Sequence, residues 1–194
     1  PVSDVLSREP LTSRARQHLQ LVQKNISRML LLINQVLDFR KIQTKKMGLT
    51  VEYRDILIML HDIMDNFRLL ATEKNINFTL QTTLSSVFLW IDCDKFEKII
   101  FNLLSNAFKY TPDNKAITLI VTESGQFVSI AVKDEGVGIQ KDKVPSIFER
   151  FTTISKENDM QPSSGIGLSL VNELVKMLHG EILVESEVRK GSVF

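Results

Sequence analysis

Cysteine is nearly absent from this chain of 194 residues, in which Cys93 is the only one. A single cysteine can form neither an internal disulfide framework nor a cysteine-based zinc site. An excess of one charge is missing too, because 24 Lys and Arg residues stand against 23 Asp and Glu residues. The formal net charge of +1 gives no reason to expect binding to nucleic acid, or contact of this segment with a membrane surface.

Long apolar runs are also lacking. No stretch reaches the ~18 residues that span a membrane, and no leader of the signal-peptide type is present. The chain starts at Pro1 without a methionine and stops at Phe194 inside an apolar segment, so we expect it to be a piece of a longer protein. With 43% hydrophobic and 24% charged residues, its composition is that of a globular protein large enough for a real core.

The first group of apolar residues forms a long helical seam. Residues Leu11 to Lys45 predict one helix, because large apolar side chains recur there at alternating spacings of three and four. One helix cannot bury such a stripe alone, so we expect residues 1–47 to be part of an antiparallel helical hairpin that dimerises. The alternative is a long helix lying on its own domain. The seam consists of Leu19, Val22, Ile26, Met29, Ile33 and Val36, widened by Leu30 and Leu37.

The pattern then changes to shorter helices and strands. Helical periodicity covers Ile56 to Thr72 and Ile166 to Leu178, and a third helix is predicted to begin at Asp94, an N-cap whose capping box Glu97 completes. Over residues 48–194 we therefore expect an α+β fold, an α/β sandwich with helices on one face of a mixed, mostly antiparallel sheet. The predicted strands are Leu49 to Tyr53, Ile76 to Leu80, Val87 to Ile91, Ile117 to Thr122, Phe127 to Lys133 and Glu181 to Glu187.

Two carboxamide side chains and a lysine lie on one face of the helix that is predicted to begin at Asp94. Asn102 and Asn106 are one helical turn apart, and Lys109 lies three residues further on nearly the same face. A carboxamide oxygen can ligate Mg²⁺ without adding charge, and an ammonium group neutralises phosphate. The pattern predicts a magnesium and phosphate site, with Glu97 one turn back in a position to orient a ligand or water. The alternative is a polar stripe that faces solvent.

A carboxylate and two glycines follow the strand that ends at Lys133. In the string D-E-G-V-G, Asp134 can accept a hydrogen bond from an exocyclic amine such as adenine N6. Gly136 and Gly138 allow a turn with positive φ and a close approach of the backbone. The alternative is an ordinary hairpin turn.

A second glycine pair opens the last helix. The string S-S-G-I-G-L, from Ser163 to Leu168, would present unpaired N–H groups and the positive end of a helix dipole to a phosphate. The sequence contains neither the Walker A spacing nor the Rossmann glycine spacing. The alternative is a simple helix cap. The preceding residues, Thr152 to Ser164, are polar and contain Pro162, which predicts a mobile loop.

Together these motifs resemble those of the sensor histidine kinases of two-component systems, whose ATP-binding domain is of the gyrase–Hsp90–histidine kinase–MutL type. The resemblance covers essentially the whole chain, because the helix Leu11 to Lys45 is similar to the second helix of that family's dimerisation and histidine-phosphotransfer hairpin. The stretch Leu32 to Ile42 resembles hybrid kinases in particular. The motifs are Asn102 to Tyr110 (N box), Asp134 to Gly138 (G1 box), Phe148 to Phe151 (F box), Gly165 to Leu168 (G2 box) and Gly191-Ser192 (last glycine box).

The resemblance implies roles for individual residues. Asn106 would ligate Mg²⁺ with Asn102 beside it, Lys109 would contact phosphate, and these three would be the catalytic residues. Asp134 would recognise adenine N6, and the loop Thr152 to Ser164 would be the ATP lid. Catalysis would consist of positioning and electrostatic stabilisation. The other nucleotide-binding residues would be Tyr110, Gly136, Gly138, Ile139, Phe151, Ser164, Gly165, Ile166, Gly167 and Leu168.

For the whole protein, the resemblance implies transfer of the γ-phosphoryl group of ATP to a histidine on the dimerisation helix. Further expectations are a homodimer, a phosphorelay to the receiver domain of a response regulator, and a cytoplasmic location for this segment in an inner-membrane sensor protein. Two other functions stay open. One is a catalytically silent ATP-binding clamp or scaffold, and the other is an ATPase of the chaperone or topoisomerase branch.

The sequence departs from the family pattern in two places. The phosphoacceptor motif H-E-[L/I]-R-x-P-L, which belongs on the first hairpin helix, is absent, so we expect that this segment alone cannot autophosphorylate. Ser163 stands where G2 boxes usually begin with another glycine. This second departure concerns lid flexibility or phosphate affinity rather than the fold.

Overall fold

The structure, a computed structural model, describes residues 13–44, 46–150, 152 and 165–194. The chain divides into two compact units, Pro1–Met47 and Gly48–Phe194. Over the described residues, no helix combines the length and the apolar character that a membrane crossing requires.

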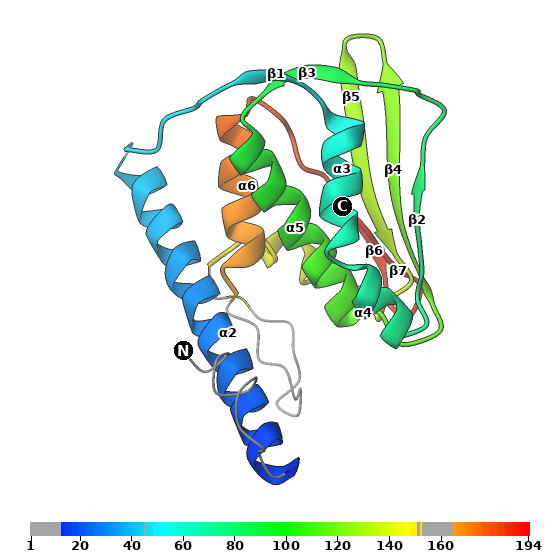
Figure 1. The fold of residues 1–194 in the computed structure, drawn as a ribbon. Helices are drawn as coiled ribbons and strands as arrows, with labels where there is room; N and C mark the ends of the chain where they lie inside the picture. The colour runs from blue at the N-terminus through cyan, green and yellow to red at the C-terminus, as the bar shows by residue number, and fades with distance from the viewer. Residues whose placement is uncertain (1–12, 45, 151, 153–164) are drawn as a thin grey trace. The chain divides into compact units, whose positions relative to one another are not determined.

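The first unit contains the long helix α2, Ser13–Gln43, drawn in blue in Figure 1. Its predicted seam is exposed, since the large apolar side chains from Val22 to Leu37 that form it are between 45% and 62% accessible. Exposure of a continuous apolar stripe is costly in water, so the helix still requires a partner. The other helix of the predicted hairpin falls outside the described residues, and the dimerisation role of residues 1–47 stays a prediction.

In the second unit, five strands form one sheet in the order β2-β4-β5-β7-β6. Strands β2 and β4 run parallel, whereas the other neighbours are antiparallel. A separate pair, β1 (Glu52–Asp55) and β3 (Phe88–Ile91), is antiparallel. The strands of the large sheet are β2 (Asn77–Gln81), β4 (Ala116–Ser124), β5 (Phe127–Asp134), β6 (Glu185–Glu187) and β7 (Gly191–Val193).

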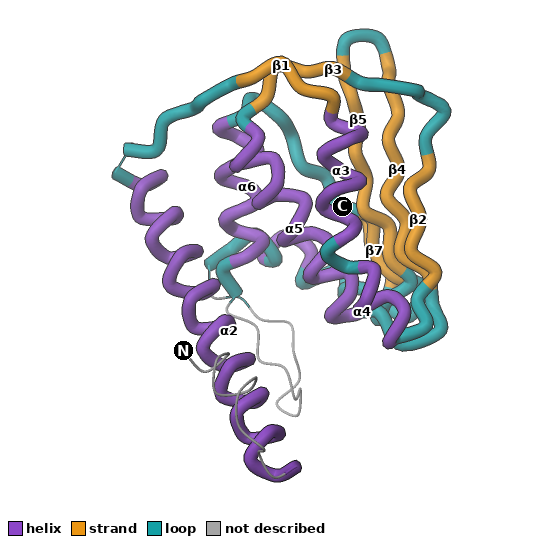
Figure 2. The backbone as a smooth tube through the Cα atoms, in the orientation of Figure 1, coloured by secondary structure: helices purple, strands orange, loops and turns teal. Residues whose placement is uncertain are grey.

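Helices α3, α5 and α6 lie on one face of this sheet, and Figure 2 shows the two layers by colour. The covered face is apolar, because Ile117, Leu119 and Val121 alternate along β4 and are at most 1% exposed. The ring of Phe108 on α5 meets that of Phe78 on β2 edge to face, with centroids 5.0 Å apart. The predicted α+β class is thus confirmed. The helices are α3 (Ile56–Asp65), α4 (Arg68–Glu73), α5 (Cys93–Tyr110), α6 (Gly167–Met177) and a 3₁₀ turn, Val144–Ser146.

The predicted helix over residues 56–72 is wrong in one respect, because it is broken into α3 and α4. The break lies at Asn66 and Phe67. The Asn66 side-chain amide donates to the carbonyls of Asp62 (3.0 Å) and Ile63 (3.3 Å), which satisfies the end of α3 locally. Asparagine competes with the helical ladder in this way, and hydrophobic periodicity does not report it.

The predicted start of α5 is also wrong, because its N-cap is Asp92 and not Asp94. Asp92 has extended backbone angles, and its Oδ1 accepts from the Lys95 amide at 3.2 Å. The residue three positions after the cap is therefore Lys95, so Glu97 cannot complete a capping box. Asp94 lies in the first turn and pairs with Lys98 at 3.0 Å.

The Asp92 carboxylate joins the start of α5 to the segment that contains Thr50. Its Oδ2 accepts from the Lys95 ammonium (2.7 Å) and from the Thr50 backbone amide (2.7 Å). Burial opposes ionisation of Asp92, but the hydrogen bonds from Lys95 and Thr50 outweigh it and lower the pKa of the carboxyl below its usual value. The ion pair is itself buried, so it fixes the chain that leaves Gly48 against the start of α5.

Two predicted strands are displaced or shortened. The strand expected at Leu49 to Tyr53 is β1, which begins three residues later, and the strand expected at Glu181 to Glu187 is limited to β6. The limit on β6 has a simple cause. Its neighbour β7 has three residues, so pairing stops at Glu185 opposite Val193.

Candidate functional site

The asparagine face of α5 is one wall of the site. Asn102, Asn106 and Lys109 are half-buried, while the opposite side of the helix buries Leu104 and Phe108 in the core. This division fixes the rotation of α5, because the apolar residues must face the sheet. The polar side chains consequently line up at the margin of the core, where a ligand could reach them.

The start of α6 lies against this wall. A Cβ atom added to Gly167 would come within 3.0 Å of the Asn102 side-chain oxygen. The Asn102 amide meanwhile donates to the Lys98 carbonyl at 2.6 Å, which holds its oxygen toward α6. A residue larger than glycine at position 167 would crowd Asn102, so the N-box and G2-box residues meet directly.

The last turn of α5 joins the wall to the D-E-G-V-G loop. The Lys109 ammonium lies 5.0 Å from the centroid of the Tyr110 ring, within the range of a cation–π contact. The Tyr110 carbonyl accepts from the Val137 amide at 3.2 Å. A Cβ atom on Gly136 would lie 2.8 Å from the same carbonyl. Gly136 is therefore required by the close approach of two backbones.

Asp134 ends β5 with its carboxyl buried, at 6% exposure for the residue. Its Oδ1 accepts from the Gly136 amide at 2.7 Å. Burial raises the pKa of the Asp134 carboxyl above its ordinary value, against the opposing hydrogen bonds from the amides of Gly136 and Ser192. A hydrogen bond donated by a ligand amine would offset the cost of ionising this buried carboxyl.

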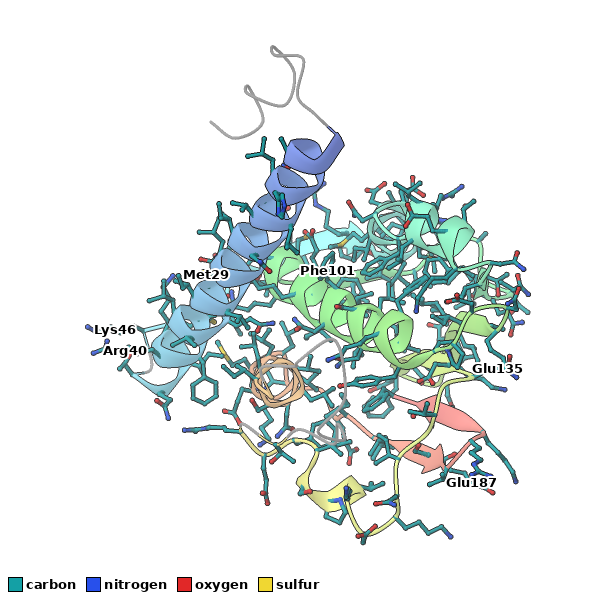
Figure 3. All side chains as sticks on the ribbon, turned by 90° about the horizontal axis from the view of Figure 1, so that it is seen from below. Met29, Arg40, Lys46, Phe101, Glu135 and Glu187 are labelled. Atoms are coloured by element: carbon teal, nitrogen blue, oxygen red, sulfur yellow. The ribbon has the colours of Figure 1, made fainter. Side chains whose placement is uncertain are left out.

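Gly138 closes the loop against β6. Its φ of 67° lies in the left-handed region, and a Cβ atom there would overlap the Glu187 carbonyl. Figure 3 shows the neighbouring Glu135 side chain on the outside of the unit, where its Oε2 accepts from the Ala116 amide at 3.1 Å. Of the two carboxylates in D-E-G-V-G, Asp134 alone is thus buried within the loop.

A row of paired residues crosses the sheet at this level. The register places Phe78, Ile117, Asp134, Ser192 and Ser186 opposite one another from β2 to β6. Side chains of directly paired residues share one face of a sheet. Since Phe78 meets α5, this is the helix-covered face. The row is apolar under the helices and polar from Asp134 onward, so the site sits at the edge of the core.

The glycine-rich entry to α6 supplies the remaining part. Gly165 has a φ of 65°, and Ile166 occupies the N-cap position with an apolar side chain that cannot accept from the first turn. The helix runs for 11 residues from Gly167. Its first N–H groups and the positive end of its dipole therefore suit an anion.

Residues 91–194 match the family model of histidine kinase-, DNA gyrase B- and HSP90-like ATPases. The chain belongs to this family. The ATP-binding catalytic domain predicted from the motifs is thereby confirmed. The candidate site described above lies within the matched residues.

Curated relatives of this ATPase segment are sensor kinases. The sensor histidine kinase TmoS of Ectopseudomonas mendocina is 36% identical over 178 residues, covering 90% of this chain and 18% of that protein. The sensor histidine kinase WalK of Bacillus subtilis is 30% identical over 92% of this chain and 30% of its own length. Histidine kinase P4 of Formosa agariphila is 30% identical over 100% of this chain and 14% of its own. The chain thus spans less than a third of each.

Solved structures of histidine kinases share the fold. Full-length ShkA in complex with AMPPNP has a TM-score of 0.80 at 24% identity, over 97% of this chain and 39% of that one. Histidine kinase ThkA in complex with the response regulator protein TrrA has a TM-score of 0.72 at 18% identity, over 100% of this chain and 55% of that one. At such identities the likeness concerns the fold of the ATPase domain.

The residues predicted for the ATPase site come together in most cases. Most of them lie on α5, on the loop after β5 and at the start of α6, which the structure brings together. Phe151, Ser164 and residues 153–164 of the predicted lid lie outside the described residues. Glu97 is the exception, because it lines a hollow of about 130 Å³ with Met59, Asp62, Ile63 and Asn66 and so faces α3. The gathered residues are Asn102, Asn106, Lys109, Tyr110, Asp134, Gly136, Gly138, Ile139, Gly165, Ile166, Gly167 and Leu168.

The sequence patterns do not predict two groups that support the candidate site. The Lys74 ammonium donates to the carbonyls of Phe108 (2.6 Å) and Thr111 (3.0 Å) and so caps the end of α5. The Ser186 hydroxyl accepts from the Ile139 amide at 2.8 Å. Lys74 lies 34 residues from Phe108, and no local pattern signals a contact of that span. Ser186 becomes visible once the strand register is known.

Proposed function

We propose that this segment is the catalytic part of a sensor histidine kinase, which binds ATP with Mg²⁺ and transfers the γ-phosphoryl group to a histidine of its dimerisation hairpin. The observation that carries the proposal is the contact between Asn102 and Gly167. It brings the asparagine face of α5 against the glycine-rich start of α6, as a nucleotide with a bound cation requires. Membership in the ATPase family and the names of the relatives support it.

The chemistry of each group fits one part of the nucleotide. Asp134 is a buried acceptor suited to the adenine amine, and Asn106 offers a neutral oxygen to Mg²⁺. Lys109 supplies positive charge for phosphate oxygens, and the amides of the α6 entry supply donors. The remaining proposed contacts are Tyr110, Gly136, Gly138, Ile139, Phe151, Ser164, Gly165, Ile166, Gly167 and Leu168.

The same groups favour phosphoryl transfer to an imidazole over hydrolysis. Water must lose a proton when it attacks a phosphoryl group, whereas an imidazole nitrogen attacks with its own lone pair. The α5 groups assigned to the site are the carboxamides of Asn102 and Asn106 and the ammonium of Lys109. A carboxamide is not a base, and an ammonium group has no lone pair with which to accept a proton. The site can therefore position reactants and offset charge without acting as a base.

The proposal extends to partners and location. The exposed α2 seam would form a homodimer with a second copy, and the phosphoryl group would pass on to the receiver domain of a response regulator. The complex of ThkA with TrrA supports the second point by analogy. The segment would lie in the cytoplasm as part of an inner-membrane sensor protein.

Nucleotide binding is the first test. ATP, or a non-hydrolysable analogue, with Mg²⁺ should raise the melting temperature of the 194-residue chain, by the equivalent of about 2.7 kcal/mol at 100 times its Kd. Asn106→Ala should weaken binding in the presence of Mg²⁺ and change it little in EDTA, because the side chain acts through the cation. The matched control is Ser105→Ala, one residue away and exposed. Calorimetric titration separates these cases.

Two results would contradict this part of the proposal. A melting temperature that does not move at millimolar nucleotide would remove the binding site itself. An Asn106→Ala variant with an unchanged Mg²⁺-dependent titration would remove the ligand assignment while leaving the site.

Transfer is the second test. A longer piece of the parent protein that includes the first hairpin helix should incorporate label from [γ-³²P]ATP into a histidine, giving a phosphoramidate that is labile in acid. Replacing that histidine by glutamine is the control. A longer piece that binds ATP but takes up no label would favour the silent clamp.

A further inference from the structure

One hydroxyl group next to the proposed adenine position makes three short polar contacts. Ser186 Oγ accepts from the Ile139 amide at 2.8 Å, donates to the Gly191 carbonyl at 2.9 Å and lies 3.0 Å from the Ser192 hydroxyl. It therefore connects the loop after β5 with both residues at the start of β7. Ser186 is half-buried, and Ser192 is buried at 7% exposure.

The proton count at Ser186 fixes the direction of the third contact. A hydroxyl carries one proton and two lone pairs. The Ile139 amide can only donate and the Gly191 carbonyl can only accept, so the proton of Ser186 is used on Gly191. The contact with Ser192 must then run from the Ser192 hydroxyl to Ser186. What remains free on the Ser192 oxygen is acceptor capacity.

This polarity matters because Ser192 is the strand neighbour of Asp134. The two residues are directly paired between β5 and β7, and the Ser192 amide donates to the Asp134 carboxyl. The carboxylate of Asp134 is an acceptor, and with Ser186 in place the Ser192 oxygen is an acceptor too. Asp134 and Ser192 thus both offer acceptors to a ligand bound next to them.

We propose that Ser186 is a specificity-determining residue of the nucleotide site, which orients the Ser192 hydroxyl away from the base so that a 6-amino purine is favoured over a 6-oxo purine. The proposal rests on the proposed function. A 6-amino purine presents N–H donors, directly or through a water, to the acceptors of Asp134 and Ser192. A 6-oxo purine presents an oxygen at the same place, and two acceptors facing each other leave both unpaired.

The test compares the dissociation constants of ATP and ITP by calorimetric titration of the 194-residue chain. Their bases differ in the 6-substituent and in the proton that a 6-oxo purine carries on N1, so the change in the Kd ratio between variants is the quantity that reports on Ser186. Ser186→Ala frees the Ser192 hydroxyl to turn and donate to the 6-oxo group. The Kd ratio of ITP to ATP should therefore fall roughly three- to tenfold, the size of one hydrogen bond. Loss of packing or of the Ile139 contact alone would weaken both nucleotides equally and leave the ratio unchanged.

Further variants sharpen the result. Ser186→Thr keeps the hydroxyl on a residue suited to a strand, so it should retain the ratio. In a Ser192→Ala background, Ser186→Ala should have no further effect on the ratio, because the group it orients is gone. Ser129→Ala, on an exposed position of β5, is the matched control and should leave both constants unchanged. Ser192→Ala alone keeps Ser186 and removes the oriented acceptor, so it should itself lower the ratio. An unchanged ratio in that variant would refute the proposal even if Ser186→Ala does not fold.

Failure of this proposal is distinguishable from failure of the proposed function. Wild-type protein that binds neither nucleotide would refute the function. Tight binding of ATP together with a ratio that Ser186→Ala does not alter would refute the role of Ser186 alone. A ratio near one in the wild-type protein would have the same meaning.

Discussion

Asp134 meets two opposing demands within one side chain. Its buried acceptor is suited to an adenine amine, yet burial disfavours the charge that makes it a strong acceptor. The raised pKa of the carboxyl means that the folded protein binds this proton more tightly than the unfolded chain does. The residue is thus held for the ligand at a cost to the stability of the empty fold.

The neutral variant Asp134→Asn should therefore be more stable than the wild type without nucleotide. When the pKa of a carboxyl is higher in the folded protein than in the unfolded chain, the protein loses stability as the pH rises from the unfolded pKa of about 3.9 to the folded pKa. Above the folded pKa the loss of stability is constant. The gain in melting temperature should consequently be small at pH 4 and largest at pH 8. Thermal denaturation of both proteins over this range is the measurement.

The same variant should lose affinity for ATP, because an amide group presented to the adenine amine adds a donor where an acceptor is required. Asp142→Asn, on an exposed turn, is the control and should change neither property. A variant that melts lower than the wild type at pH 8, or that binds ATP with unchanged affinity, would show that Asp134 is a structural residue.

The placement of a residue could be predicted from the sequence where a local period governs it. The four-residue spacing of Asn102 and Asn106 implies one helix face, and the structure has them on one side of α5. Ser186 could not be predicted, because its neighbours depend on strand register. A shift of one residue in β6 would have turned its side chain to the other face of the sheet.

At the scale of elements, the end of α5 is held from outside the helix. The Lys74 ammonium reaches the carbonyls of Phe108 and Thr111 from the turn after α4. These groups lie in the last turn, where carbonyls lack helical partners and the dipole is negative. The turn also carries Lys109 and Tyr110, so Lys74 stabilises a part of the proposed site that it does not touch.

Lys74→Met keeps the apolar stem and removes the donors, so it should lower the free energy of unfolding by about 1–2 kcal/mol. Hydrogen exchange should accelerate at the amides around Thr111, and affinity for ATP should fall. Lys115→Met is the control, because Lys115 is exposed in the neighbouring turn. If denaturant unfolding gives equal stabilities for Lys74→Met and the wild type, the capping role is wrong.

Most elements could be predicted from their periodicity, and their ends could not. Helix α5 has apolar residues at helical spacing throughout, but the string Asp92-Cys93-Asp94 contains two possible caps. The buried contacts of Asp92 with Thr50 and Lys95 decide between them, and Thr50 lies 42 residues away from Asp92. Tertiary contacts of this kind override the local signature, which favoured Asp94 because Glu97 follows it by three residues.

At the scale of the whole molecule, the two units have separate tasks in the proposed function. Gly48–Phe194 would hold the phosphoryl donor, and Pro1–Met47 would provide the surface for a second copy. The fold class of the larger unit could be predicted because alternating and helical patterns are distinct along the chain. The apolar seam of α2 was equally clear in the sequence. Such a pattern shows that a helix face must be buried, but it does not identify the partner that buries it.

The last prediction concerns the apolar seam of α2. The 194-residue chain should be a dimer, and Leu30→Glu or Ile33→Glu should each convert it into a monomer. Both side chains are half-exposed on α2, at 56% and 50%, and burying each against a partner contributes up to about 1.5–3 kcal/mol. A carboxylate at either position would have to be desolvated without a counter-charge. Light scattering gives the mass directly.

The control variant is Asn34→Glu, which places the same charge on α2 beside Ile33 but off the seam, and it should remain a dimer. All three variants should bind ATP as the wild type does, because the proposed nucleotide contacts lie in Gly48–Phe194. Retention of the dimer by Leu30→Glu and Ile33→Glu would exclude this face as the interface. Loss of the dimer in all three would point to a general effect of negative charge, since the seam argument depends on which side of the helix the carboxylate occupies.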